Sequence, residues 1–444
     1  MDFVNHTPFP AQPFQAIDQF GQEFHVFTVR QTFNFGSGEL RIAEVQPDLC
    51  ATDIAFDDSP AGSVEQESDY VPFKPRCDVI VNATAHPPAR AGLKNFPVRL
   101  CLWRHGEGKY LIDKELVVHG RRVLCRRCWP ARATMWVLKW CTLTLLRPCP
   151  WRIRLAGPCV PVPVRYEHAY GGECVVDADS PASRRVPKKA RLTAEQVACH
   201  PETSAGRAAP IAHVGFDPNP TGTGFAQAWY LRAARRRMID APSIERPGAM
   251  LKARQFWRWL APARQAECEA SPFQVPAGFG SLPKGHPERR ALVGTVDDAF
   301  IAGDAPLPDN FDFAIWNSAP ADQQIDYPSG GEEIELANLC AAGSPGTRTD
   351  EGKNVYLRLR LPGDQCVLHL SDTDGRESIL PMVLDTILVE PEAQLLTLVW
   401  RRTIPFDDMD VSSVELHYGT PSALERKRFV LNHPKALTSG ADHG

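Results

Sequence analysis

The sequence lacks any long hydrophobic segment. No window reaches the roughly 18 consecutive apolar residues that a membrane-spanning helix needs, and the nearest, from Met135 to Leu146, is short and contains Lys139. The opening stretch, MDFVNHTPFPAQPFQAIDQF, has neither a basic start nor a continuous apolar run, so it does not match a secretory signal. We therefore expect a cytoplasmic protein that makes no contact with a membrane.

A strong charge of one sign is also absent. The formal net charge is −4 over 444 residues, which is too small to favour the polyanionic surface of a nucleic acid or of an acidic membrane. We therefore predict no nucleic-acid partner.

Long helices are not expected, because 40 prolines and 31 glycines interrupt the chain. Apolar and polar residues alternate over 26–31, 78–85, 98–103, 355–361, 383–389 and 395–403, which is typical of half-buried β-strands. With 43% hydrophobic residues the chain can fill a sizeable core. The predicted fold class is mainly β, with antiparallel sandwich-like or barrel-like sheets, long Pro/Gly-rich loops and a few short helices.

Changes in composition divide the chain into five predicted parts. They are an N-terminal β part (1–120), an insertion rich in Arg, Cys and Trp (121–160), a second β part (161–340), a C-terminal β region (341–430) and a flexible tail (431–444). Within the insertion we expect a helical stretch at 134–145. No role follows from the sequence for the cysteine-rich stretch 121–174.

The usual catalytic and cofactor motifs are missing. The segment NPTGTGF from Asn219 has neither the ending of a P-loop nor the setting of a dinucleotide fold, so a tight turn is the better interpretation. No HExxH motif and no nucleophile elbow is present. Cys125 and Cys128 form a CxxC pair without a second pair downstream, so free thiols are expected and a zinc site is the weaker alternative. We predict no cofactor and no metal.

Acidic residues and aromatics are concentrated between Gly294 and Leu339. Two carboxylates in this segment could hydrolyse a glycosidic bond if their separation suited that chemistry. The neighbouring pair Glu167 and His168 could act as acid and base, although a structural polar cluster before the double glycine is the simpler interpretation. A carbohydrate-active hydrolase is therefore kept as the alternative function.

Nine motifs in register carry a resemblance to one family. In chain order they are TFNFGSGELRIAEVQPDL, SDYVPFKPRCDVIVNATAHPP, RYEHAYGG, NPTGTGF, APSIERP, PAGFG, GTVDDAF, PDNFDFAIWNSAPADQQ and GGEEIELANL. Together they span roughly residues 20 to 340 and resemble the bacterial domain-of-unknown-function 2169 family, as does LDTILVEPEAQLLTLVWR from Leu384. The chain departs from the family pattern at Val296, where an aromatic residue is common, and at Phe300, where tryptophan is common.

The resemblance implies a function in type VI secretion, because members of the family are encoded beside spike proteins and PAAR-tip proteins. It implies a non-enzymatic adaptor or chaperone that binds an effector, or its PAAR or spike carrier, and assists loading before secretion. No catalytic residue follows from it. As partner-binding residues we predict Trp316, Asn317, Asp322, Gln323 and Tyr170, with the exposed side of the 294–339 segment as the docking face.

Overall fold

The computed structural model describes residues 1–56, 62–104, 106, 108–127, 136, 149–296, 298–303, 305–373, 375–406, 411–420 and 424. The predicted helix at 134–145, Cys128 and the predicted tail 431–444 lie outside this range, apart from Trp136. The fold class is confirmed: the protein is mainly β, with antiparallel and mixed sheets and few short helices.

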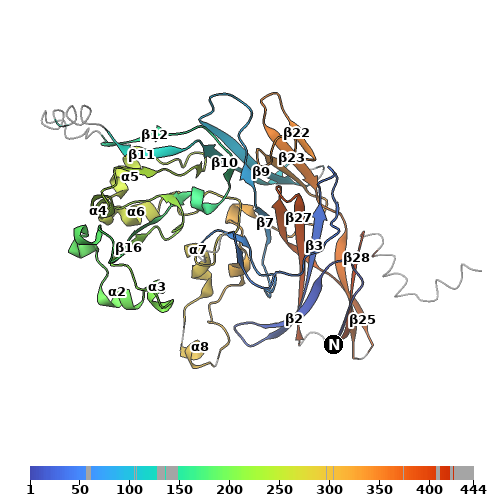
Figure 1. Cartoon of the computed structure of the whole chain (residues 1–444). Coiled ribbons are helices and arrows are strands. Elements are labelled where there is room, and N and C mark those ends of the chain that lie inside the picture. The colour runs from blue at the N-terminus through green and yellow to red at the C-terminus, as the bar shows by residue number, and fades with distance from the viewer. Residues whose placement is uncertain are drawn as a thin grey trace, which may run out of the picture.

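A seven-stranded sheet brings the two ends of the sequence together (Figure 1). Its order is β2 (Ala11–Ile17), β3 (Glu23–Asn34), β27 (Leu395–Pro405), β26 (Val383–Glu390), β7 (Cys77–Val81) and β20 (Gln324–Ile325), with β4 (Arg41–Ile42) beside β3. The antiparallel hairpin of β26 and β27 confirms the turn chemistry of the sequence. One pair, β7 with β26, is parallel, so the sheet is mixed.

Two further sheets complete this part of the molecule. The six-stranded sheet has the order β19 (Ile244–Glu245), β10 (Tyr110–His119), β9 (Asn95–Trp103), β21 (Glu333–Ala337), β23 (Val355–Arg360) and β22 (Thr347–Thr349). The four-stranded sheet has the order β1 (Asp2–Asn5), β28 (Val411–Gly419), β24 (Gln365–Asp372) and β25 (Glu377–Pro381). Strands of all three sheets contribute to one hydrophobic core. We call this part the β lobe.

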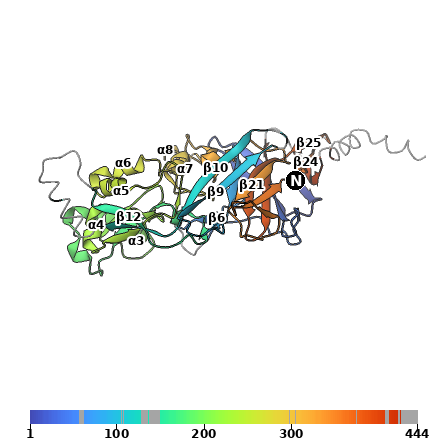
Figure 2. The same cartoon turned by 90° about the horizontal axis from the view of Figure 1, so that it is seen from above.

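A second hydrophobic core, from Leu124 to Phe273, lies under short strands and helices. Its main sheet has the order β12 (Trp151–Leu155), β11 (Arg122–Arg126) and β18 (Met238–Asp240). We call this part the mixed lobe, and Figure 2 shows it beside the β lobe along the long axis of the molecule. The division of the chain into five parts stays a prediction, but β21 pairs with β23 across the expected boundary at 340.

The remaining strands are short pairs. They are β5 (Ile54–Ala55) with β6 (Val64–Gln66), β8 (Thr84–Ala85) with β13 (Val162–Pro163), β14 (Tyr170–Gly171) with β17 (Thr223–Gly224), and β15 (Glu173–Val176) with β16 (Ala212–Gly215).

The helices are all short. The α-helices are α2 (Ala194–Ala198), α3 (Pro201–Ser204), α4 (Ala228–Ala233), α5 (Ala253–Trp259), α6 (Gln265–Glu269), α7 (Pro287–Arg290) and α8 (Asp298–Ala302). The 3-10 turns are η1 (Tyr166–His168), η2 (Ser183–Arg185), η3 (Lys188–Ala190), η4 (Pro262–Arg264), η5 (Ala291–Val293), η6 (Phe313–Trp316) and η7 (Ala321–Gln323). No helix within the described ranges is long and apolar enough to cross a bilayer.

Two central strands differ from the half-buried pattern that alternation predicts. β3 is buried on both faces from Val26 to Phe33, and every residue of β7 is buried. The polar face of β3 is covered because Arg30 forms an ion pair with Asp69, whose carboxylate also accepts from the backbone N–H of Cys50 (3.0 and 2.8 Å). A polar face can be buried in this way when each group finds a partner.

Candidate functional site

The second part of the 294–339 segment is anchored to the sheet by one buried carboxylate. Asp78 on β7 is fully buried and accepts a hydrogen bond from the side-chain amide of Asn317 (3.0 Å). It also accepts from the backbone N–H groups of Ser318 (2.9 Å) and Ala319 (3.3 Å). The Lys74 ammonium completes the set at 2.9 Å. Asp78 thus binds a loop more than 200 residues away in sequence, which is a structural use of a carboxylate.

A second buried ion pair lies close to the first. The Arg401 guanidinium donates to Asp385 (2.6 Å) and to the backbone carbonyls of Asp69 (2.8 Å) and Val71 (2.6 Å). Burial disfavours the charge on Lys74, but the carboxylates of Asp78 and Asp385 outweigh this effect and raise the Lys74 pKa. The network is therefore charged and internally satisfied, as buried ions must be.

Gln323 connects the same segment to the six-stranded sheet. Its side-chain N–H groups donate to the carbonyls of Val79 (2.6 Å) and Phe279 (2.8 Å), and its oxygen accepts from Lys114 on β10 (2.6 Å). Lys114 also donates to Asp322 (2.8 Å). Burial lowers the Lys114 pKa to about 8, because the ammonium has lost its hydration and Asp322 restores only part of that loss.

Asp322 and Trp316 are the predicted residues that reach the surface. The Asp322 side chain is about half exposed and lies between Lys114 and Arg246, the latter at 3.7 Å. Trp316 is partly buried, with the Lys284 ammonium 5.7 Å from its ring centroid. Its indole N–H is buried and has no hydrogen-bond acceptor among the described residues. Both side chains remain accessible to a partner at the edge of the β lobe.

The other three predicted contacts lie inside the protein, which corrects the expectation of a surface role. Asn317 and Gln323 are at most 2% exposed and make the contacts given above. Tyr170 belongs to the core of the mixed lobe, where its hydroxyl lies 3.2 Å from the Cys268 sulfur. A side chain with so little exposed surface cannot contribute contact area to a partner. Its polar groups are already bonded within the fold.

Glu332 and Glu333 of the segment have local partners. Glu332 is buried and accepts from the backbone N–H of Ser329 (3.1 Å), and Glu333 accepts from Arg358 (2.8 Å). In the described part of the chain, five well-formed cavities of about 10 to 610 Å³ are lined by residues other than Asp322, Glu332 and Glu333. The carboxylate pair expected for a hydrolase is therefore not found facing any of these cavities.

The Glu167–His168 pair also has a structural use. Residues 166–168 form the 3-10 turn η1 rather than a strand. The Glu167 carboxylate accepts from the backbone N–H and the hydroxyl of Ser63 (2.6 and 2.7 Å). Burial lowers the pKa of His168.

The NPTGTGF segment is a tight turn, as predicted. The buried side-chain amide of Asn219 donates to the carbonyls of Tyr166 (2.8 Å) and Tyr170 (3.1 Å). A Cβ at Gly222 would lie only 2.7 Å from the Cα of Gly171, so the close approach of the two backbones requires glycine here. Cys125, from the CxxC pair, is buried on β11.

The first part of the 294–339 segment presents apolar side chains to solvent. Figure 1 shows α8 at the bottom of a long loop, at about the level of the lower ends of β2 and β25. Val296 and Ile301 are 57% and 71% exposed, and Phe300 and, just before the segment, Val293 are also exposed. We call these four residues the α8 projection. The sequence analysis concentrated on the acids of this segment and did not single out these apolar side chains, although apolar residues beside glycine and aspartates in a loop were a signal.

The mixed lobe contains a groove that sequence reasoning also missed. Its volume is about 610 Å³, and its lining combines three cations with apolar side chains and no acid. We call it the basic groove, lined by Arg185, Pro187, Lys189, Ala190, Val214, Ala228, Trp229, Arg232, Ala261, Pro262 and Ala263. Its cations come from η2, η3 and α4, which are separated in sequence.

Comparison with known proteins supplies a family. A family model described as "Uncharacterized protein conserved in bacteria (DUF2169)" matches residues 20–401. No curated protein and no solved structure matches the chain. The match covers the α8 projection, the basic groove and both buried ion pairs.

Proposed function

The chain belongs to the DUF2169 family, and from this premise and from its surface we propose that it is a non-enzymatic adaptor or chaperone. It binds a type VI secretion effector, or the PAAR or spike protein that carries the effector, and assists loading in the cytoplasm before secretion. The secretion context rests on the resemblance described above. The binding role rests on the α8 projection.

The α8 projection supports binding because four exposed apolar side chains lie close together in the sequence of one segment. Single exposed hydrophobic residues are normal on a protein surface, but a cluster of them marks an interaction site. Burying a side chain the size of Ile301 against a partner contributes on the order of 2 kcal/mol. Val296 and Ile301 together would account for an appreciable part of the affinity.

Catalysis finds less support in the geometry. The carboxylates of the 294–339 segment hold turns, strands and a buried lysine, and none of Asp322, Glu332 and Glu333 faces a described cavity. The alternative of a carbohydrate-active hydrolase would need another carboxylate pair at a suitable separation.

The test is co-purification with the products of the neighbouring genes. The double variant Val296→Asp/Ile301→Asp places two charges on the α8 projection and should weaken capture of the partner by about tenfold or more, because a charge in an apolar interface stays desolvated. The matched control is Val45→Asp, at a single valine that is 77% exposed outside the projection. Capture that is equal for all three proteins, or no complex with any neighbouring product, would contradict the proposal.

A charge reversal distinguishes the second candidate surface. The Arg232 side chain lines the basic groove, and its Nε donates to the carbonyl of Ala228 one turn earlier on α4 (3.1 Å). If an acidic segment of the partner binds in this groove, Arg232→Glu should weaken capture and steepen its loss with salt. If binding uses the α8 projection, Arg232→Glu should leave capture unchanged.

A further inference from the structure

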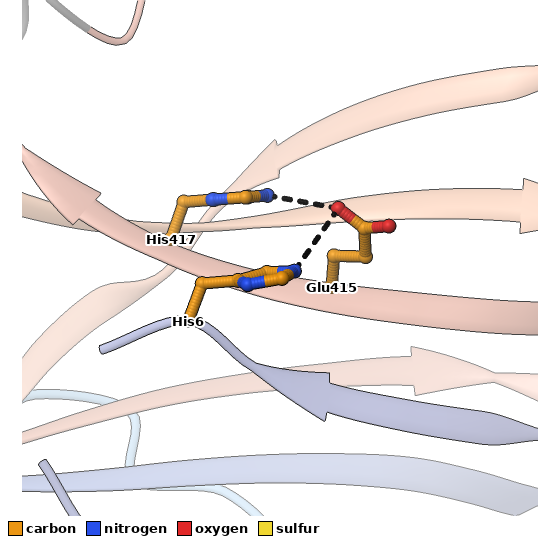
Figure 3. A group of neighbouring side chains, drawn as sticks. All are labelled: His6, Glu415 and His417. Atoms are coloured by element: carbon orange, nitrogen blue, oxygen red, sulfur yellow. Dashed lines mark hydrogen bonds and ion pairs between the residues drawn. The ribbon is translucent and has the colours of Figure 1, made fainter. Parts of the chain in front are cut away.

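Three potential metal ligands converge on one face of the four-stranded sheet. Glu415 and His417 are two residues apart on β28 and therefore point to the same side. β1 runs parallel to β28 with Asn5 paired to Leu416, and the backbone N–H of His6 donates to the carbonyl of Leu416 (3.0 Å). This register brings His6 alongside His417, as Figure 3 shows.

The ligand atoms already have nearly the spacing that a metal requires. The Nε2 atoms of His6 and His417 lie 3.5 and 3.1 Å from the same oxygen of Glu415. All three ligand atoms are within 4.8 Å of one another. In a tetrahedral zinc site with bonds of about 2.0–2.2 Å, the ligand atoms are about 3.3–3.6 Å apart. Small side-chain rotations would complete the site.

The two imidazole rings lie next to each other, and they would tilt out of their parallel arrangement to bind one ion through both in-plane lone pairs. They are stacked, with centroids 4.8 Å apart and planes 11° from parallel, and both direct Nε2 at Glu415. A simple ion pair needs one histidine, whereas here a second imidazole approaches the same oxygen. Two imidazoles and one carboxylate match the donor preference of zinc and similar divalent cations, and they do not suit calcium or magnesium.

We propose that His6, Glu415 and His417 bind a zinc-class divalent cation, with a fourth position open to water. His417 is mostly buried, whereas His6 and Glu415 are about half exposed, so an ion can enter from solvent. His369 on β24 is a positioning residue. It is paired with Glu415 across the strands, and its ring centroid lies 4.4 Å from that of His417.

The cation would hold together the first and last strands of the fold. β1 and β28 both lie outside residues 20–401 of the family match. The family match therefore does not include the site, and the proposed metal site is independent of the proposed adaptor function. A metal that binds the folded state alone raises the free energy of unfolding according to its concentration and affinity.

Cobalt(II) titration of the full-length, reduced protein tests the site, because cobalt reports its ligands in the visible spectrum. We expect one equivalent with d–d absorption and no thiolate charge-transfer band, followed by displacement with zinc. A thiolate charge-transfer band would appear if cysteines bound the cobalt, so its absence distinguishes this site from a cysteine site. Absence of binding, or a thiolate band from the single equivalent, would overturn the proposal.

Variants identify which residues bind the single equivalent of cobalt. His6→Ala, at a half-exposed position that folding tolerates, and Glu415→Gln should each weaken binding by about tenfold or more, since even outer-shell changes cost that much. The matched control is His213→Ala, which removes a histidine 3.4 Å from Glu173 in the mixed lobe. Zinc should raise the melting temperature of the wild type and of the control, but not of His6→Ala. Equal affinity in His6→Ala and the wild type would contradict the assignment.

Discussion

The two parts of the 294–339 segment use their residues in opposite ways. The Asn317 and Gln323 side chains are buried and bind Asp78, Lys114 and the adjacent sheets, whereas Asp322 beside Gln323 is about half exposed. In the α8 projection, apolar side chains such as Ile301 are exposed to solvent. The usual division of polar outside and apolar inside is reversed at both places.

This difference indicates which part is scaffold and which part is surface. A buried polar group is retained only when it has partners, so the 317–323 stretch is fixed by its hydrogen bonds. An exposed apolar side chain such as that of Ile301 gains little from the folded monomer and can contribute contact area to a partner. Asp322, the acid within the 317–323 stretch, pairs with Lys114 as part of that scaffold.

The largest effect on stability is expected from removing the Asp78 carboxylate, which anchors the buried 317–323 stretch. Asp78→Ala leaves the Lys74 ammonium buried without its closest carboxylate and deprives two backbone N–H groups of their acceptor. Breaking a buried pair in this way should lower the free energy of unfolding by about 3–5 kcal/mol. Urea denaturation followed by fluorescence measures it.

The control for this change is an exposed aspartate of the 294–339 segment. Asp326 pairs with Arg76 at 3.4 Å, but its side chain is 90% exposed. Asp326→Ala should leave the urea midpoint nearly unchanged, since exposed pairs contribute little. Equal stability of Asp78→Ala and Asp326→Ala would contradict the assignment of the 317–323 stretch to the scaffold.

A smaller effect on stability is expected from a change of pH, because Lys114 titrates differently in the folded and unfolded protein. Its pKa is lowered from 10.5 in the unfolded chain to about 8 in the folded protein, so between these values the unfolded chain binds more protons. Stability must therefore rise with pH across this window. The gain from about pH 7.5 to about pH 9.5 should be about 2 kcal/mol for this one group.

Comparison with Lys114→Met isolates this contribution from other titrating groups. The difference in unfolding free energy between wild type and variant should shift in favour of the wild type as pH rises. A difference that is constant over this pH range would show that Lys114 keeps its ordinary pKa, and that Gln323 and Asp322 do not hold a desolvated ammonium.

The smallest effect on stability is expected at the α8 projection. Val296→Asp/Ile301→Asp should change the free energy of unfolding by no more than about 0.5 kcal/mol, because both side chains are mostly exposed. Thermal or urea denaturation of the purified variant measures this. A large loss of stability would assign these residues to the scaffold and would remove the main argument for a binding surface.

Much of the fold was predictable because alternation along a strand is a local signal. The strands at 355–361, 383–389 and 395–403 were found in this way. Local pattern did not predict that β3 and β7 are buried on both faces, since this depends on the distant partners Asp69 and Asn317. Local pattern also does not set the start of α5, because Gly248 has a φ of 79° and the helix begins only at Ala253.

The site was less predictable, for a related reason. Val79 and Val296 are the same residue type, yet one is fully buried and the other is exposed, and only the tertiary arrangement decides which. The predicted partner residues Asn317 and Gln323 were chosen for their polar side chains in a loop. Long-range partners bury such side chains, and single-sequence patterns contain no information on those partners.

The pairing of β3 with β27 has a consequence for synthesis of the protein. Every residue from Asn34 back to Phe24 pairs with a residue between Leu395 and Pro405. At a translation rate of about 5–20 residues per second, β3 emerges from the ribosome roughly 20 to 70 s before its neighbour exists. During that interval β2 and the short β4 cover one edge of this long strand, and the edge that will face β27 has no partner strand. The nascent chain therefore carries an unpaired strand edge until its last hundred residues are made. Such an edge can bind a chaperone or pair with another chain.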